Sequence, residues 1–62
     1  MFDTMKYNEF HRIIKRHGWQ EIRQRGSHIM YEKNGVKVIV PHHGSKEMAE
    51  GLRLKLIKEM GL

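Results

Sequence analysis

The sequence predicts a small α+β fold in which a helix, a three-stranded antiparallel meander and a second helix follow one another. Three observations carry this prediction. Apolar residues recur at helical spacing near both ends of the chain, over about 5–17 and 46–60. Between them lie three short β-rich runs, at about 20–25, 28–33 and 36–40. Two-residue turn motifs separate these runs, so consecutive strands should pair as hairpins.

The length and composition suit one small domain. The chain has 62 residues, no cysteine and 39% hydrophobic residues. This is enough for a single core, so we expect one domain over 1–62, with 1–4 as a loose extension. Neither an apolar run of transmembrane length nor a basic-then-apolar signal pattern occurs. A cytoplasmic protein that does not bind membranes is therefore expected.

The first helix is expected from about Met5 to His17. Thr4 is predicted to be its N-cap, and Gly18 its left-handed stop. One stripe of this helix is predicted to face the core, and it consists of Tyr7, Phe10, Ile14 and, at its edge, His17. We expect His11 and His17 to be surface or packing residues rather than catalytic ones.

The second helix is expected from about Lys46 to Met60. Ser45 is its predicted N-cap, and Gly61 closes it. Its predicted core stripe consists of Ala49, Leu52, Leu56 and Met60. A glycine inside a helix costs roughly 1 kcal/mol relative to alanine. Gly51 is therefore expected where the helix packs closely against its surroundings.

Two turn motifs set the pairing of the three strands. Asn34-Gly35 favours a type I′ turn, which needs positive φ at both positions, and Gly26-Ser27 favours a type II′ turn with glycine first. The Asn34-Gly35 loop predicts three cross-strand pairs on one apolar face of the sheet, namely Lys33–Val36, Tyr31–Val38 and Ile29–Val40. Both helices should cover this face.

The opposite face of the sheet is predicted to stay open and to carry most of the polar side chains. The Gly26-Ser27 turn places Arg25 opposite His28 and Arg23 opposite Met30. Further along the same face lie Ile39 and an expected cross-strand ion pair between Glu32 and Lys37. His28 is thereby predicted to point away from the core, among basic neighbours.

The start of the first strand is the weakest part of this register. There the register predicts that Ile22 joins Tyr31 on the apolar side of the sheet. It also predicts that Glu21 faces Glu32, a mildly unfavourable like-charge pair. Trp19 nominally falls on the open face but is expected to fold back into the core. A one-residue bulge would reverse the strand and move its arginines.

His28 is the candidate catalytic residue. The chain carries 12 Lys and Arg against 7 Asp and Glu, a net charge of +5, which favours a polyanionic partner such as nucleic acid or an acidic protein. Imidazole titrates near neutral pH and suits general acid or base work. Arg23, Arg25 and Lys37 are the cations expected to hold a phosphodiester beside it.

Other chemistry is less well supported by the sequence. His42 and His43 are adjacent, which cannot easily place both imidazoles on one ion, so neither a metal site nor another cofactor is predicted. Ser27 lacks an orienting acid and points away from His28 in an extended chain, so a nucleophilic role is not expected. Gly26 and Ser27 are instead predicted to form the turn that positions His28.

An ordered set of short motifs resembles the HicA family of toxins. The set consists of Gly18-Trp19, Gly26-Ser27-His28, Val40-Pro41, His43 and Gly61-Leu62. The similarity runs from about 5 to 62. The second helix reads Gly51-Leu52-Arg53-Leu54 where the family often has Gly-Thr-Leu-Arg, a difference that bears on packing or partner contacts.

The resemblance implies a fold and an activity. The fold would be like that of double-stranded-RNA-binding domains, α-β-β-β-α, which matches the order predicted above. The activity would be that of an mRNA interferase of a type II toxin–antitoxin system, an endoribonuclease whose catalytic histidine would be His28. The resemblance further implies cleavage without a metal, and a HicB-like antitoxin that covers the site. We expect a monomer when free and a hetero-oligomer with the antitoxin.

Two alternatives from other functional classes are consistent with the sequence. The chain could be a non-catalytic RNA-binding module that recognises RNA by shape and 2′-OH contacts. It could also be a basic protein-interaction domain with no RNA activity. RNA cleavage distinguishes the first expectation from both alternatives.

Overall fold

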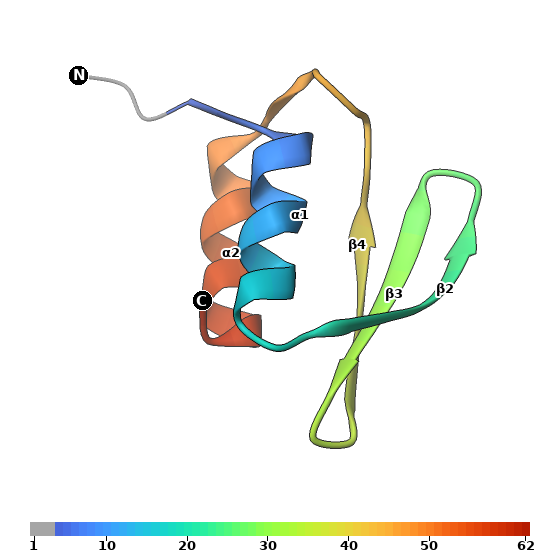
Figure 1. The fold of residues 1–62 in the computed structure, drawn as a ribbon. Coiled ribbons are helices and arrows are strands. Elements are labelled where there is room, and N and C mark those ends of the chain that lie inside the picture. The colour runs from blue at the N-terminus through green and yellow to red at the C-terminus, as the bar shows by residue number, and fades with distance from the viewer. Residues whose placement is uncertain (1–3) are drawn as a thin grey trace.

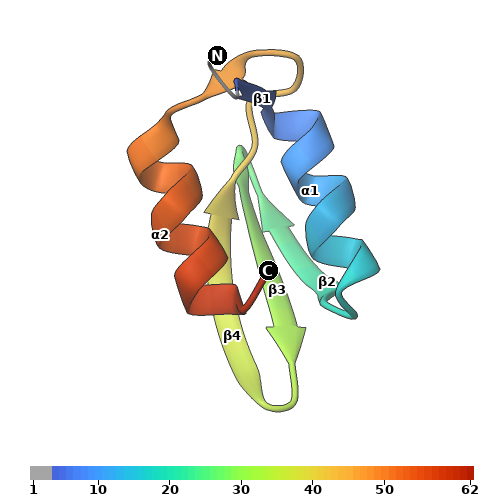
Figure 2. The same ribbon diagram turned by 90° about the vertical axis from the view of Figure 1, so that its left-hand side faces the viewer.

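The computed structural model describes residues 4–62 and has the predicted helix–meander–helix order. Its elements are β1 (Met5–Lys6), α1 (Tyr7–Arg16), β2 (Gln20–Arg25), β3 (His28–Lys33), β4 (Val36–Pro41), β5 (Glu47–Met48) and α2 (Glu50–Met60). The three long strands form one antiparallel sheet in the order β2-β3-β4, and β1 pairs with β5. Both helices lie on the same side of the three-stranded sheet (Figures 1 and 2). The predicted α+β architecture is confirmed, while the proposed extension at 1–4 falls outside the described residues except for Thr4.

The core lies between the helices and the covered face of the sheet. Its buried hydrophobic residues are Tyr7, Phe10, Ile14, Trp19, Ile29, Tyr31, Val40, Met48, Leu56 and Met60. Trp19 folds back as expected, and its indole Nε1 donates a hydrogen bond to the carbonyl oxygen of Met60 at 3.2 Å. His17 and Ala49, which were predicted to lie on the core stripes, are exposed.

The predicted N-cap of the first helix is wrong. α1 begins at Tyr7 with Lys6 as its N-cap, because Met5 and Lys6 are extended and pair with Met48 and Glu47. The first amides of the helix donate instead to loop carbonyls, Tyr7 to Lys46 and Asn8 to Gly44, each at 3.1 Å. These distant carbonyls, together with the carboxylate of Glu9, which accepts from the amide of Lys6 at 3.3 Å, have therefore replaced the predicted cap at Thr4.

The predicted start of the second helix is also wrong. α2 begins at Glu50 with Ala49 as its N-cap, rather than at Lys46 after Ser45. The same β1–β5 pairing keeps Glu47 and Met48 extended. Gly51 has no close neighbour either: a Cβ built there would meet nothing within 4 Å, so the expected close packing is absent.

The predicted hairpin turns are confirmed. Asn34 and Gly35 have φ values of 52° and 81°, as a type I′ turn requires, and Gly26 has a φ of 59°. The β3–β4 register matches the prediction, and Glu32 pairs with Lys37 along the backbone. Their side chains form no ion pair; the ion pairs found within residues 4–62 are Lys15–Glu21, Glu50–Arg53 and Lys55–Glu59.

A β-bulge interrupts the start of β2 between Glu21 and Arg23. It places Gln20 opposite Glu32 and Glu21 opposite Tyr31, so the predicted Glu21–Glu32 pairing is wrong. Ile22 is the unpaired residue of the bulge, and its side chain is 43% exposed instead of packing beside Tyr31. The bulge lies on the side of Arg23 that is away from the Gly26-Ser27 turn. It therefore leaves Arg23 opposite Met30 and Arg25 opposite His28, as predicted.

Candidate active site

His28 is the first residue of β3 and follows the Gly26-Ser27 turn directly. Its side chain is exposed, while those of its neighbours Ile29 and Tyr31 are buried on the helix side. Alternation along the strand therefore directs His28 to the open face of the sheet, as predicted. No hydrogen bond found among residues 4–62 engages its imidazole, which leaves both ring nitrogens accessible to a ligand.

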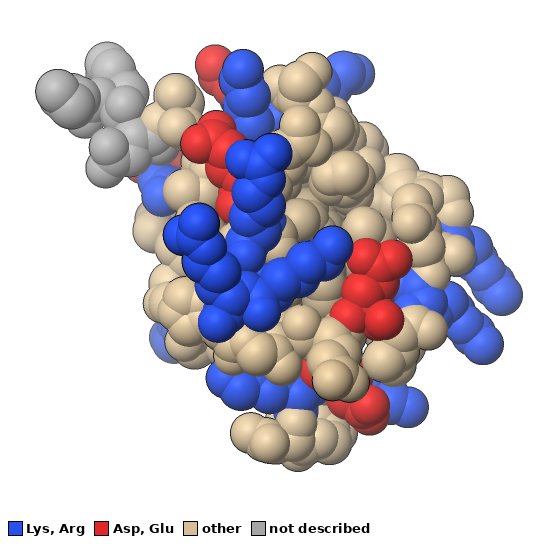
Figure 3. All heavy atoms as spheres, in the orientation of Figure 1, with Lys and Arg blue, Asp and Glu red and all other residues tan. Residues whose placement is uncertain are grey.

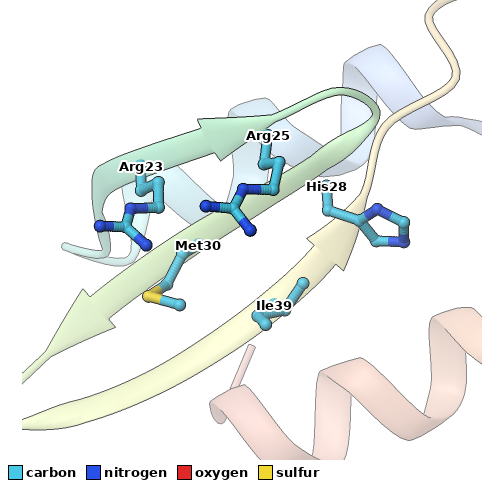
Figure 4. A pocket seen from close by; sticks show the side chains of 5 residues that line it. All are labelled: Arg23, Arg25, His28, Met30 and Ile39. Atoms are coloured by element: carbon cyan, nitrogen blue, oxygen red, sulfur yellow. The ribbon is translucent and has the colours of Figure 1, made fainter.

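Five side chains from three strands surround an open depression on this face. They are Arg23 and Arg25 from β2, His28 and Met30 from β3, and Ile39 from β4, and the depression has a volume of about 280 Å³ (Figure 4). Cross-strand pairing arranges them in two rows. The first row is Arg25–His28–Pro41 and the second is Arg23–Met30–Ile39. Hairpin register is thus what brings the two arginines beside the histidine.

Lys37 lies further from His28 than the other predicted site residues. It occupies the same face but pairs with Glu32, one row beyond Ile39, and it does not line the depression. The row of Lys37 and Glu32 is four residues along β3 from His28, which corresponds to roughly 13 Å. The structure therefore brings together His28, Arg23 and Arg25, whereas Lys37 lies apart from them on the same face.

The guanidinium groups of the depression are available to an anion. Arg23 and Arg25 are exposed, and neither takes part in the ion pairs formed within residues 4–62. In Figure 4 both extend from β2 toward the middle of the sheet. Two unpaired guanidinium groups beside an imidazole can bind a phosphodiester through bidentate hydrogen bonds and stabilise negative charge that develops on it.

The turn that carries His28 is held from the neighbouring strand. The amide of His42 donates to the carbonyl oxygen of Ser27 at 2.7 Å, just beyond the end of β4. The imidazole of His42 in turn lies 3.2 Å, measured from Nε2, from Oδ1 of Asn8 in α1. The turn before His28 is thus connected to α1 through His42.

His11 is a buried packing residue of this region, one of the two roles expected for it, but the sequence did not predict its contacts. It is only 5% exposed, and its Nε2 donates to the carbonyl oxygen of Pro41 at 2.9 Å. Because a carbonyl only accepts, Nδ1 of the neutral ring is the acceptor for the hydroxyl of Tyr31, at 2.5 Å. The available signal was its spacing, since it lies four residues after Tyr7 and three before Ile14, on the buried side of α1.

Burial changes the acid–base behaviour of this pair. It lowers the pKa of His11 below the ordinary value of 6.5, and the positive groups of His42 and Lys15 lower it further. The hydrogen bond to Pro41 and the carboxylate of Glu21 oppose this effect. Burial, with a contribution from Glu21, raises the pKa of Tyr31 to about 12. Both groups are consequently neutral at physiological pH.

A second basic surface lies on the opposite side of the fold. α1 contributes Arg12, Lys15 and Arg16, and Figure 3 shows basic side chains gathered over this helix. It is separated from the depression by the sheet itself. Neither helix of the described chain is long and apolar enough to span a bilayer.

Comparison with known proteins gives the family. Residues 7–62 match the family model described as the HicA toxin of bacterial toxin–antitoxin systems. A probable mRNA interferase HicA from Pseudomonas fluorescens (strain Pf0-1) is 45% identical over 58 residues, which cover 94% of this chain and 97% of that protein. The probable mRNA interferases HicA 1 and HicA 2 of Photorhabdus laumondii subsp. laumondii are each 36% identical over 58 residues, covering 94% of this chain and 100% and 98% of those proteins. No solved structure was found to match. The chain therefore belongs to the HicA family of toxins.

Proposed function

We propose that this protein is a toxin that cleaves mRNA in the cytoplasm and that His28 transfers the proton in the cleavage step. The observation that carries the proposal is the juxtaposition of an exposed imidazole with Arg23 and Arg25, whose guanidinium groups have no acidic partner in the described chain. The names of the Pseudomonas and Photorhabdus relatives, probable mRNA interferases, support the choice of substrate.

The proposed reaction is attack of a ribose 2′-oxygen on the adjacent phosphorus. The new P–O2′ bond forms as the P–O5′ bond breaks, giving a 2′,3′-cyclic phosphate and a 5′-hydroxyl. His28 serves as the base that takes the 2′-OH proton or as the acid that protonates the leaving 5′-oxygen, and water completes the other transfer. Arg23 and Arg25 hold the phosphate and stabilise its developing charge. Lys37 binds a phosphate further along the strand.

This route needs no metal ion. Residues 4–62 contain no group of three or more His, Cys, Asp or Glu side chains that could hold one. One correctly placed acid or base contributes about 10²–10⁴-fold to the rate. The two guanidinium groups would add to that factor by stabilising the negative charge that develops on the phosphate.

A HicB-like antitoxin is the proposed protein partner. Membership of a toxin–antitoxin family supports the existence of an antitoxin. We propose that it neutralises the toxin by covering the open face, and that the free toxin is a monomer which forms a hetero-oligomer with it. An acidic or apolar segment would complement the arginines and the exposed Ile39 of this face.

The decisive experiment compares purified wild type with His28→Ala and with His17→Ala. His17 is also an exposed histidine, but it hydrogen-bonds the carbonyl oxygen of Ile13 in its own helix and lies outside the depression. We expect His28→Ala to abolish cleavage of RNA in the presence of a chelator and His17→Ala to cleave like wild type. Equal cleavage by His28→Ala and wild type would refute the assignment, and turnover of an all-deoxy substrate would refute the 2′-OH route.

A further inference from the structure

We propose that the row formed by Met30 and Ile39 binds the unpaired base of the nucleotide next to the cleaved phosphate, so that the site accepts single-stranded RNA. This inference rests on the proposed function and adds to it the form of the substrate. It concerns the apolar part of the depression, which the proton-transfer and phosphate-binding roles leave unused.

The register of the sheet places an apolar surface one step away from the reacting groups. Met30 and Ile39 lie directly opposite each other on β3 and β4, and Arg23 flanks Met30 on β2. The neighbouring row contains Arg25 and His28. Two residues of β-strand separate the rows by about 7 Å. That separation is close to the spacing of consecutive phosphates in an extended single strand, so one nucleotide can span both rows.

The chemistry of the second row matches a nucleotide rather than a phosphate alone. Ile39 is 54% exposed and Met30 is partly exposed, and together they form the apolar part of a depression that is otherwise lined by Arg23, Arg25 and His28. A nucleobase has an apolar face that packs on such side chains, and the guanidinium of Arg23 can stack on it or hold the next phosphate. Neighbouring side chains of the protein can thus contact both the base and the phosphate backbone of one nucleotide.

A duplex cannot use this surface in the same way. In A-form RNA the base faces are stacked inside the helix, and proteins reach mainly the phosphates, the 2′-hydroxyls and the base edges of the shallow groove. Contact with Met30 and Ile39 requires a base that has left the stack, which is least costly in a single strand. The apolar row therefore favours unpaired RNA.

The charge of the depression distinguishes this ligand from an apolar protein segment. Arg23 and Arg25 flank the apolar row without acidic partners in the described chain, and Lys37 continues the positive charge beyond it. A polyanion complements all three cations, which an apolar segment would leave unpaired. We therefore assign the row to RNA and treat docking of the antitoxin alone as an outcome that the experiment can reveal.

The test uses two matched substitutions on one strand. Ile39→Thr removes apolar surface from the row while retaining a β-branched side chain. Val36→Thr is the control, because Val36 is on β4 too and is 52% exposed, but alternation places it on the opposite face. Met30→Gln, which keeps an unbranched side chain, provides a second variant of the row. Thermal melts verify that each variant folds.

Steady-state cleavage is measured with a labelled oligoribonucleotide, alone and annealed to its complement. We expect wild type to cleave the single strand and to leave the duplex essentially intact. Loss of the buried apolar contact should raise KM several-fold for Ile39→Thr or Met30→Gln and by on the order of tenfold for the double variant, with kcat changed less. Val36→Thr should match wild type.

The outcomes separate the inference from the proposed function. Cleavage of single strand and duplex at equal rates, or an unchanged KM in the row variants, would overturn the inference while leaving the role of His28 intact. Row variants that escape inhibition by the antitoxin but keep wild-type KM would assign the row to protein docking. If wild type cleaved nothing, fluorescence anisotropy with the labelled single strand would still test base binding, and an unchanged Kd for Ile39→Thr would overturn it.

Discussion

The buried imidazole of His11 donates a hydrogen bond to the carbonyl oxygen of Pro41, with 2.9 Å between Nε2 and the oxygen. Pro41 ends β4, an edge strand, and lies directly opposite His28. Proline has no amide hydrogen for the ladder, and its carbonyl points away from β3, so the contact from α1 satisfies an otherwise unpaired edge group. The first helix is thereby attached to the strand beside the candidate catalytic histidine.

This arrangement predicts that the stability of the protein falls in mild acid. The pKa of His11 is below 6.5 in the folded protein, whereas the unfolded chain has the ordinary value. As the pH falls through 6.5 the unfolded state takes up the proton first, so the free energy of unfolding decreases until the lower folded-state pKa is reached. Urea denaturation at pH 7.5 and pH 5 should show this loss. His11→Gln should lose much less stability between these pH values, while His17→Gln should behave like wild type.

The hydroxyl of Tyr31 should be important for stability because it satisfies His11. Tyr31→Phe leaves Nδ1 of His11 buried without a partner, so we expect a loss of about 1–3 kcal/mol in the free energy of unfolding. Tyr7→Phe is a matched control, since Tyr7 is also buried but its hydroxyl makes no hydrogen bond that the structure of residues 4–62 contains. Similar losses for both substitutions would contradict the proposed hydrogen-bond role.

Arg25 and Lys37, two of the cations of the open face, should differ in their effects on RNA. Arg25→Gln should lower both kcat and affinity, because Arg25 lies opposite His28, whereas Lys37→Gln should mainly weaken binding. The logarithm of the binding constant falls linearly with the logarithm of the salt concentration. Each lost phosphate contact should make this slope less steep by about 0.7 for single-stranded RNA. Binding is measured by anisotropy at several salt concentrations, with Lys58→Gln in α2 as the control. A wild-type slope for both Arg25→Gln and Lys37→Gln would remove the two residues from the binding surface.

Two glycines should respond in opposite ways to substitution by alanine. Gly26 has a φ of 59°, which alanine adopts with strain, so Gly26→Ala should destabilise the fold by about 1 kcal/mol or more and disturb the turn before His28. A Cβ at Gly51 meets nothing within 4 Å and lies in α2. Gly51→Ala should therefore stabilise the fold by about 0.5 kcal/mol. Thermal and urea unfolding of the two variants would reveal the difference, and a stabilised Gly26→Ala would contradict the role of the turn.

The sequence was most informative where structure depends on neighbouring residues. The Asn34-Gly35 and Gly26-Ser27 turns each require backbone angles that few other residues adopt, and each fixes the register of a hairpin. Because side chains alternate along a strand, register alone determined that His28, Arg23 and Arg25 share the open face. These placements could be predicted without knowledge of the rest of the fold.

Tertiary structure decided the features that depend on contacts between distant segments. The β1–β5 pairing moved the start of both helices past their predicted caps at Thr4 and Ser45, because it keeps the residues before each helix extended. In α1, distant carbonyls accept from the amides of Tyr7 and Asn8 that a side chain would otherwise cap. The bulge at Ile22 brought Glu21 to the helix side, where it lies 3.7 Å from Nζ of Lys15.

The environment of the site also depended on the tertiary fold. Only the packing of α1 against the end of β4 buried His11 and paired it with Pro41 and Tyr31. The sequence by itself thus determined which face carries the candidate active site, through local backbone chemistry. The three-dimensional packing determined which residues support that site, because burial and pairing between distant segments do not exist in any short segment of the chain.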